Sequence, residues 1–148
     1  MNLTPKTLFR RSLMTAALAW AAAVPLAAMA DSASFTATLS GAAEVPANAS
    51  TGTGTLEATL DTSNNLLTWT LTYSGLTGPA TMAHFHGPAM PGANAGVALP
   101  FPGAASPVAG KATLTAAQVA DLMAGKWYAN VHTAANPGGE IRGQLMVK

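Results

Sequence analysis

From residue 34 onward, apolar side chains recur at every second position, and this alternation limits the fold more than any other feature of the sequence. It is typical of β-strands with one buried face, because successive side chains of a strand point to opposite sides. The residues between the apolar positions are mostly threonine, which suits the exposed face of a strand. The clearest runs are residues 35–39, 56–60 and 67–73.

The number and spacing of such runs predict an all-β fold. About seven short strands separated by turn residues are typical of an antiparallel Greek-key sandwich. One segment, residues 115–124, departs from the alternation and predicts a short helix, with Thr115 as its N-cap and Gly125 just beyond its end. We therefore expect an antiparallel β-sandwich with a single short helix.

The end of the chain predicts a hairpin. The Asn-Pro-Gly-Gly turn at residues 136–139 separates two strand-like segments, residues 126–133 and 140–147. Neither a linker nor an internal repeat interrupts residues 31–148, so we expect them to form one domain.

The first thirty residues have the order of parts that is typical of a secretory signal peptide. Three basic residues are followed by an uncharged stretch, mostly Ala, Leu and Met, at residues 12–30. The stretch ends in Ala-Met-Ala, which predicts cleavage after Ala30 and a periplasmic or secreted protein. A retained membrane anchor is the alternative, because the stretch nearly spans a bilayer. The helix break at Pro25 favours cleavage, after which we expect no stable membrane insertion.

Charge and composition exclude several classes of protein. Only 9% of the 148 residues are charged, and the net charge is +1. Removing residues 1–30 takes away three basic residues and no acidic ones, which leaves a net charge of −2. Without a cluster of Lys and Arg, we expect no binding to nucleic acid through its phosphates. The absence of cysteine excludes disulfides, thiolate metal sites and thiol nucleophiles.

The chain has three histidines, and all of them fall in two strand-like segments. His84 and His86 are two positions apart, so on a strand their imidazoles point to the same side as Met82, with about 7 Å between their β-carbons. In the second segment, His132 shares the polar face with Asn130, opposite an apolar face. Imidazoles from two such strands can converge on one metal ion.

Three neutral imidazoles without a thiolate predict a transition-metal site, with copper as the first choice and zinc as the second. A thioether from Met82 or Met90 would shift the preference toward Cu(I). Glu140 is a candidate for a fourth ligand, or for an acceptor that fixes the tautomer of an imidazole. We expect metal binding or buffering without turnover, because the sequence has no nucleophile elbow, carboxylate pair or phosphate loop.

Two alternatives stay open at this point. The histidines could be structural, in a non-catalytic interaction module whose Gly/Pro-rich residues 87–103 recognise a protein or polymer. A redox enzyme that uses the same metal against superoxide is the other alternative. The position of His132 distinguishes the metal site from the interaction module. The metal hypothesis requires one ring nitrogen from each of the three histidines to be close enough to share one ion.

Several segments of the sequence resemble the CHRD family, a domain that occurs in many exported bacterial proteins. They are residues 35–46, 52–54 and 83–89 and a closing segment made of residues 128–133 and 136–144. The resemblance implies an immunoglobulin-like or superoxide-dismutase-like β-sandwich and says little about activity. The His-x-His strand with a distant third histidine is also similar to the copper ligands of Cu/Zn superoxide dismutases. The chain lacks that family's bridging histidine, further zinc ligands and cysteines, and only Arg142 is a candidate for a cation near the site.

Overall fold

The computed structural model describes residues 31–148, so the predicted signal peptide lies outside the described residues. It confirms the all-β antiparallel fold with one short helix, α1 (Ala116–Met123), besides a single 3-10 turn, η1 (Gly41–Ala43). The strands are β1 (Ser32–Ser40), β2 (Thr53–Asp61), β3 (Leu66–Ser74), β4 (Ala80–His86), β5 (Val97–Pro100), β6 (Val108–Thr113), β7 (Tyr128–Thr133), β8 (Ile141–Gln144) and β9 (Met146–Val147).

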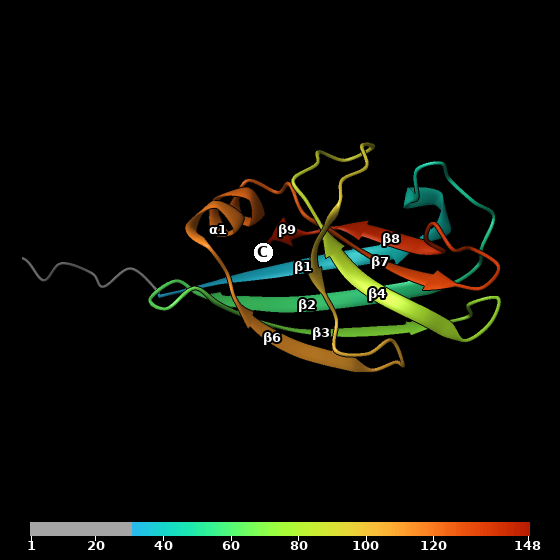
Figure 1. Cartoon of the computed structure of the whole chain (residues 1–148), viewed down its shortest axis with the longest axis horizontal. Coiled ribbons are helices and arrows are strands. Elements are labelled where there is room, and N and C mark those ends of the chain that lie inside the picture. Colours follow the sequence, from blue (N-terminus) through green and yellow to red (C-terminus); the bar gives the residue numbers. More distant parts are fainter. Residues whose placement is uncertain (1–30) are drawn as a thin grey trace, which may run out of the picture.

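Within residues 31–148 these strands form one continuous sheet in the order β5-β4-β7-β8-β1-β2-β3-β6, with β9 paired to β1. The sheet curls on itself, as Figure 1 shows, so its two halves face each other as the layers of a sandwich do. The halves are joined where β1 meets β8, at the pair of Ser40 and Arg142. The predicted hairpin is present, because β7 pairs antiparallel with β8.

The alternation seen in the sequence divides each long strand into a buried and an exposed face. Along β2, buried residues such as Leu56 and Leu60 alternate with exposed ones such as Thr59. The two halves of the sheet meet in an aromatic cluster around Phe85, which is fully buried. Its ring centroid lies 5.2 Å from that of Trp69 on β3 and 4.7 Å from that of Phe101. These contacts bury the inner face of β4 and fix its orientation.

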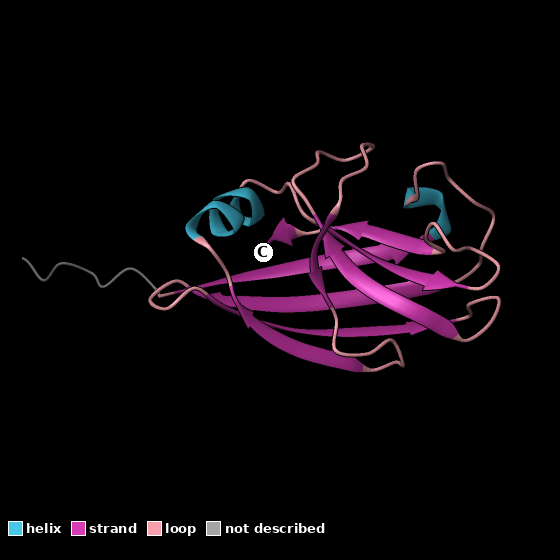
Figure 2. Ribbon diagram, viewed as in Figure 1, coloured by secondary structure: helices cyan, strands magenta, loops and turns pink. Residues whose placement is uncertain are grey.

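The helix forms where the sequence predicts it. Thr115 and Gln118 make a capping box, in which each side chain accepts a hydrogen bond from the other residue's backbone N–H. Gly125, with φ near +69°, takes the left-handed conformation that ends many helices. In Figure 2, α1 and η1 lie at opposite ends of the molecule. Among residues 31–148, none of the helices has the length and apolarity needed to cross a membrane.

We predict that Phe85→Ala lowers the free energy of unfolding by about 3–5 kcal/mol, because it removes the ring that joins the two halves of the sheet. Thr59→Ala, on the exposed face of β2, is the matched control and should change stability by less than about 0.5 kcal/mol. Chemical denaturation followed by tryptophan fluorescence measures both. Equal effects in the two variants would show that the cluster around Phe85 does not hold the halves together.

Candidate metal centre

Antiparallel pairing of β4 with β7 places the three histidines on one face of the sheet. The register sets Met82 opposite His132 and His84 opposite Asn130. The alternate positions, such as Phe85, face the core. The histidines therefore lie on the outer face of the same two strands whose inner face forms the aromatic cluster. This arrangement is the one predicted from the period of two.

The three imidazoles are close enough to share one ion. Nδ1 of His84 lies 3.2 Å from Nε2 of His132. One ring nitrogen from each of His84, His86 and His132 lies within 4.8 Å of the others. Two nitrogens bound to one ion with bonds near 2.0–2.1 Å are about 3.3 Å apart at a tetrahedral angle. His132 thus points toward the other two histidines, which is what the metal hypothesis requires.

Backbone carbonyls fix the tautomers of two of the histidines. Nδ1 of His86 lies 3.0 Å from the carbonyl oxygen of Ala95, and Nδ1 of His132 lies 2.9 Å from that of Pro137. A carbonyl only accepts hydrogen bonds, so each Nδ1 carries the proton and each Nε2 of a neutral ring keeps a free lone pair. Nε2 of His86 is buried and has no hydrogen-bond partner among the described residues. A metal ion would satisfy it.

The surroundings keep His84 and His86 neutral. Burial lowers the pKa of His84, and the neighbouring His132 and His86 lower it further. Burial also lowers the pKa of His86, against the opposing effect of its hydrogen bond to the Ala95 carbonyl. Since protonated imidazole cannot bind a metal, both shifts extend the pH range in which these rings can act as ligands.

A stack of side chains covers His86 and holds the loop at residues 87–96 in place. The ring of Tyr128 lies parallel to that of His86, with 4.9 Å between centroids. The guanidinium of Arg142 lies 3.4 Å from the centroid of the Tyr128 ring, and it donates hydrogen bonds to Asn94 Oδ1 and to the carbonyl of Ala93. Arg142 thus acts through Tyr128 and the loop. In the sequence Arg142 was only a candidate for a cation near the site, and nothing there placed it in this stack.

The three auxiliary candidates differ in exposure and surroundings. Met82 is opposite His132 in the register, and its side chain is 49% exposed. Met90, in the loop, is 59% exposed. Glu140 is fully buried, belongs to another network and is not part of the histidine cluster.

The role considered for Glu140 from the sequence needs correction, because its carboxylate is already occupied. It accepts hydrogen bonds from the hydroxyls of Ser50, Thr77 and Thr133 and from the backbone N–H of Thr77. The tautomer of His132 is fixed by the Pro137 carbonyl instead. Burial alone would raise the pKa of Glu140, but these hydrogen bonds outweigh it and lower the pKa to about 2.

A second buried carboxylate lies beside the site, and sequence reasoning missed it. Burial raises the pKa of Glu44 to about 7, although the charge of Arg142 and a hydrogen bond from the Asn130 side chain act to lower it. Glu44 comes from the connection after η1, more than eighty residues away from Asn130 in the chain. The alternation of side chains along a strand cannot predict a contact between Glu44 and a strand so far away in the chain. The resemblance of residues 35–46 to the family was the one feature of the sequence that pointed to this segment.

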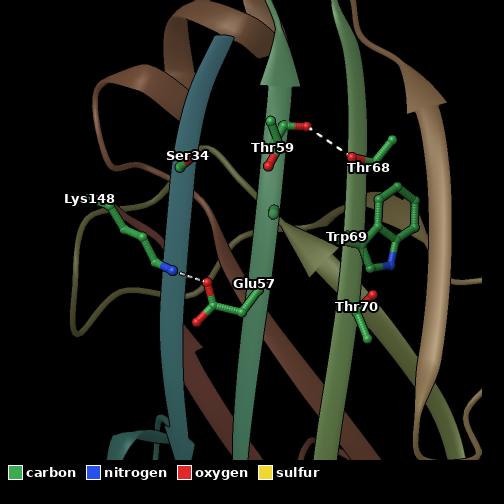
Figure 3. Close-up of a pocket in the computed structure, with 8 residues that line it drawn as sticks. Ser34, Glu57, Thr59, Thr68, Trp69, Thr70 and Lys148 are labelled. Atoms are coloured by element: carbon green, nitrogen blue, oxygen red, sulfur yellow. Dashed lines mark hydrogen bonds and ion pairs between the residues drawn. The ribbon is translucent and has the colours of Figure 1, made fainter.

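The hollows on the outer face of the other half of the sheet, formed by β1–β3, have different chemistry. Figure 3 shows one on the exposed face of β1–β3, lined by threonines and by the ion pair of Lys148 with Glu57. The Thr68 hydroxyl there donates to the Thr59 carbonyl, 3.3 Å away. These hydroxyls sit in an exposed, shallow depression, whereas the buried lone pairs suited to a transition metal lie at the histidines.

Comparison with known families gives one match. The model of the family described as the CHRD domain matches residues 35–145, which include the three histidines. No match was found among curated proteins or solved structures.

We predict that Glu140→Gln lowers the free energy of unfolding by about 1–3 kcal/mol at pH 7, because an amide replaces a buried, fully hydrogen-bonded carboxylate. A pKa lowered to about 2 contributes stability above the unfolded-state value near 4.5, and this contribution is lost as pH falls toward 2. The difference in the free energy of unfolding between the variant and the original protein should therefore shrink as pH falls from about 4.5 toward 2.

Denaturation curves from pH 7 to pH 2 measure this effect, with Asp31→Asn as the control because Asp31 is exposed. Glu44 and the histidines also make the free energy of unfolding depend on pH. Their contributions are the same in the variant and in the original protein, so they cancel in the difference between the two. A difference that stays constant down to pH 2 would contradict the role assigned to the charge of Glu140.

Proposed function

The chain belongs to the CHRD domain family, and from the histidine cluster built on this fold we propose that the protein binds one transition-metal ion, with copper as the preferred metal. The ligands are His84, His86 and His132. The observation that carries the proposal is the convergence of their ring nitrogens within 4.8 Å of one another. A structural role alone would not require three histidines from two strands to turn toward a common point.

The donor chemistry supports copper over other divalent ions. Imidazole nitrogens without thiolates suit both copper and zinc, and the affinity of such sites for divalent metals peaks at Cu²⁺. The carbonyl-bound Nδ1 atoms of His86 and His132 leave lone pairs ready before the ion arrives. We propose a binding or buffering role in an exported protein, in keeping with the signal-peptide pattern of residues 1–30.

We predict that the purified protein takes up one Cu(II) per chain with a submicromolar dissociation constant. Replacing any of the three histidines by alanine should weaken binding by about 100-fold or more, beyond the usual cost of losing a residue that only supports a ligand. Met146→Ala is the control, because Met146 is an exposed methionine on β9 and is not a candidate ligand. Titration in competition with a chelator of known affinity measures each constant, and the same titrations with Zn(II) and Cu(I) test the metal preference.

Wild-type uptake no greater than that of the histidine variants would overturn the metal proposal. The interaction module would then be the better hypothesis, with the histidines serving only to order residues 87–96. If the copper-loaded protein removed superoxide faster than an equal concentration of free copper, the redox-enzyme alternative would replace simple buffering.

The location is tested separately. We predict that the protein is exported and that Asp31 is the first residue of its exported form, because the signal-peptide pattern ends at Ala30. Mass spectrometry of the extracellular or periplasmic fraction identifies the terminus. Recovery of the protein in the membrane fraction with residues 1–30 attached would favour the retained anchor instead.

A further inference from the structure

We propose that the side-chain amide oxygen of Asn130 is a fourth ligand of the ion, so that the site has three nitrogen donors and one oxygen donor and prefers a divalent ion. The inference rests on the proposed function, since it assumes that the histidines bind a metal. It adds a ligand that the group of three histidines does not include.

Asn130 lies where a fourth ligand is expected. It is on β7, two residues before His132, and therefore on the same face of the strand. The register places it directly opposite His84 on β4. Its side chain is buried, with 3% of the residue exposed, and its Oδ1 lies 2.9 Å from Nε2 of His132. The amide oxygen thus faces the same space as the imidazoles.

Counting protons shows that this contact lacks a donor. Nδ1 of His132 donates to Pro137, so Nε2 of the neutral ring is an acceptor. The amide oxygen of Asn130 is also an acceptor, which brings two lone pairs face to face at 2.9 Å. A proton on Nδ1 of His84 could satisfy His132 but would leave the amide oxygen without a partner. A cation between the two atoms satisfies both.

The orientation of the amide is set from the side opposite the histidines. Gly139 leaves room there for the Asn130 amide and the Glu44 carboxylate, because a Cβ on residue 139 would lie 2.4 Å from Oε1 of Glu44 and 2.8 Å from Nδ2 of Asn130. The amide nitrogen thus faces the buried side chain of Glu44. When Glu44 is ionised, turning the amide around would place its oxygen against the carboxylate, so the charged carboxylate directs the amide oxygen toward the histidines.

His86 completes the convergence of acceptors. Its Nε2 is buried and makes no hydrogen bond of ordinary geometry within residues 31–148. Lone pairs from Asn130, His132 and His86 thus meet in one space at the histidine cluster, and the single proton that Nδ1 of His84 could carry cannot satisfy all three. Such a space is suited to a positive ion.

The spacing of the donors favours a divalent ion. Two donors with bonds near 2.0–2.1 Å are about 2.9 Å apart when they bind at right angles and about 3.3 Å apart at a tetrahedral angle. The separations of 2.9 Å and 3.2 Å around His132 lie at and near these values. Nitrogen and oxygen donors at angles near 90° are typical of Cu(II), whereas Cu(I) prefers softer ligands.

The test compares Asn130→Ala and Asn130→Asp with the original protein, all loaded with Cu(II). If the amide oxygen binds the ion, Asn130→Ala should bind Cu(II) about 10-fold to 100-fold more weakly and lose much less affinity for Cu(I). Water should take the vacated position, so the longitudinal relaxation rate of solvent protons should rise in the alanine variant. Asn130→Asp should restore Cu(II) affinity and the lower relaxation rate, because a carboxylate oxygen replaces the amide oxygen.

Asn48→Ala is the control, since Asn48 is a half-buried asparagine that donates to the carbonyls of Gly139 and Glu140. This variant tests whether the loss of hydrogen bonds to residues 139 and 140 is enough to change the Cu(II) affinity or the relaxation rate when Asn130 itself is unchanged. If Asn130→Ala does not fold, the aspartate variant and Asn130→Ser supply the same comparison. Unchanged relaxation and an unchanged electron paramagnetic resonance spectrum in folded Asn130→Ala or Asn130→Ser would overturn the inference.

The two proposals fail in different ways. If the original protein takes up no copper, the proposed function fails and the fourth ligand fails with it. If the original protein binds copper through the three histidines and the Asn130 variants keep its affinity and spectrum, only the fourth ligand is excluded.

Discussion

The pairing of β4 with β7 is the interaction on which the rest of the structure depends. Its inner face places Phe85 against Trp69 and joins the two halves of the sheet. Its outer face brings His84 to within 3.2 Å of His132. Because a strand has a period of two, a slip of one residue would exchange the two faces and remove both the core and the site. The burial that stabilises the fold therefore also enforces the register that the histidines need.

The candidate site is held in place by contacts within the protein. The carbonyls of Ala95 and Pro137 come from loops, and each holds one imidazole in the tautomer that a metal requires. The loop at residues 87–96 is itself fixed by Arg142, whose guanidinium covers the ring of Tyr128. Ligands that are already ordered lose little conformational freedom on binding, which favours high affinity from few contacts.

Two buried carboxylates near the site show how surroundings decide the behaviour of identical groups. Glu140 accepts four hydrogen bonds and stays ionised, with a pKa near 2. Glu44 is also buried but has few donors, and burial raises its pKa to about 7. Glu140 therefore ties together the connection before β2, the connection between β3 and β4, and the end of β7. Glu44 lies beside the amide of Asn130 near Gly139.

The longest strands, the helix and the face on which each histidine lies follow from the sequence alone, because the period of a strand and the caps of a helix are local properties. The short strands β5 and β6 did not stand out in the sequence. It could also suggest that His84, His86 and His132 form one group. Only the tertiary structure decided that their nitrogens meet, since this depends on a register between segments about fifty residues apart. It also decided that Glu140 binds hydroxyls and that Asn130 faces the histidines. Loops far apart in the chain surround both side chains, and no local pattern encodes such neighbours.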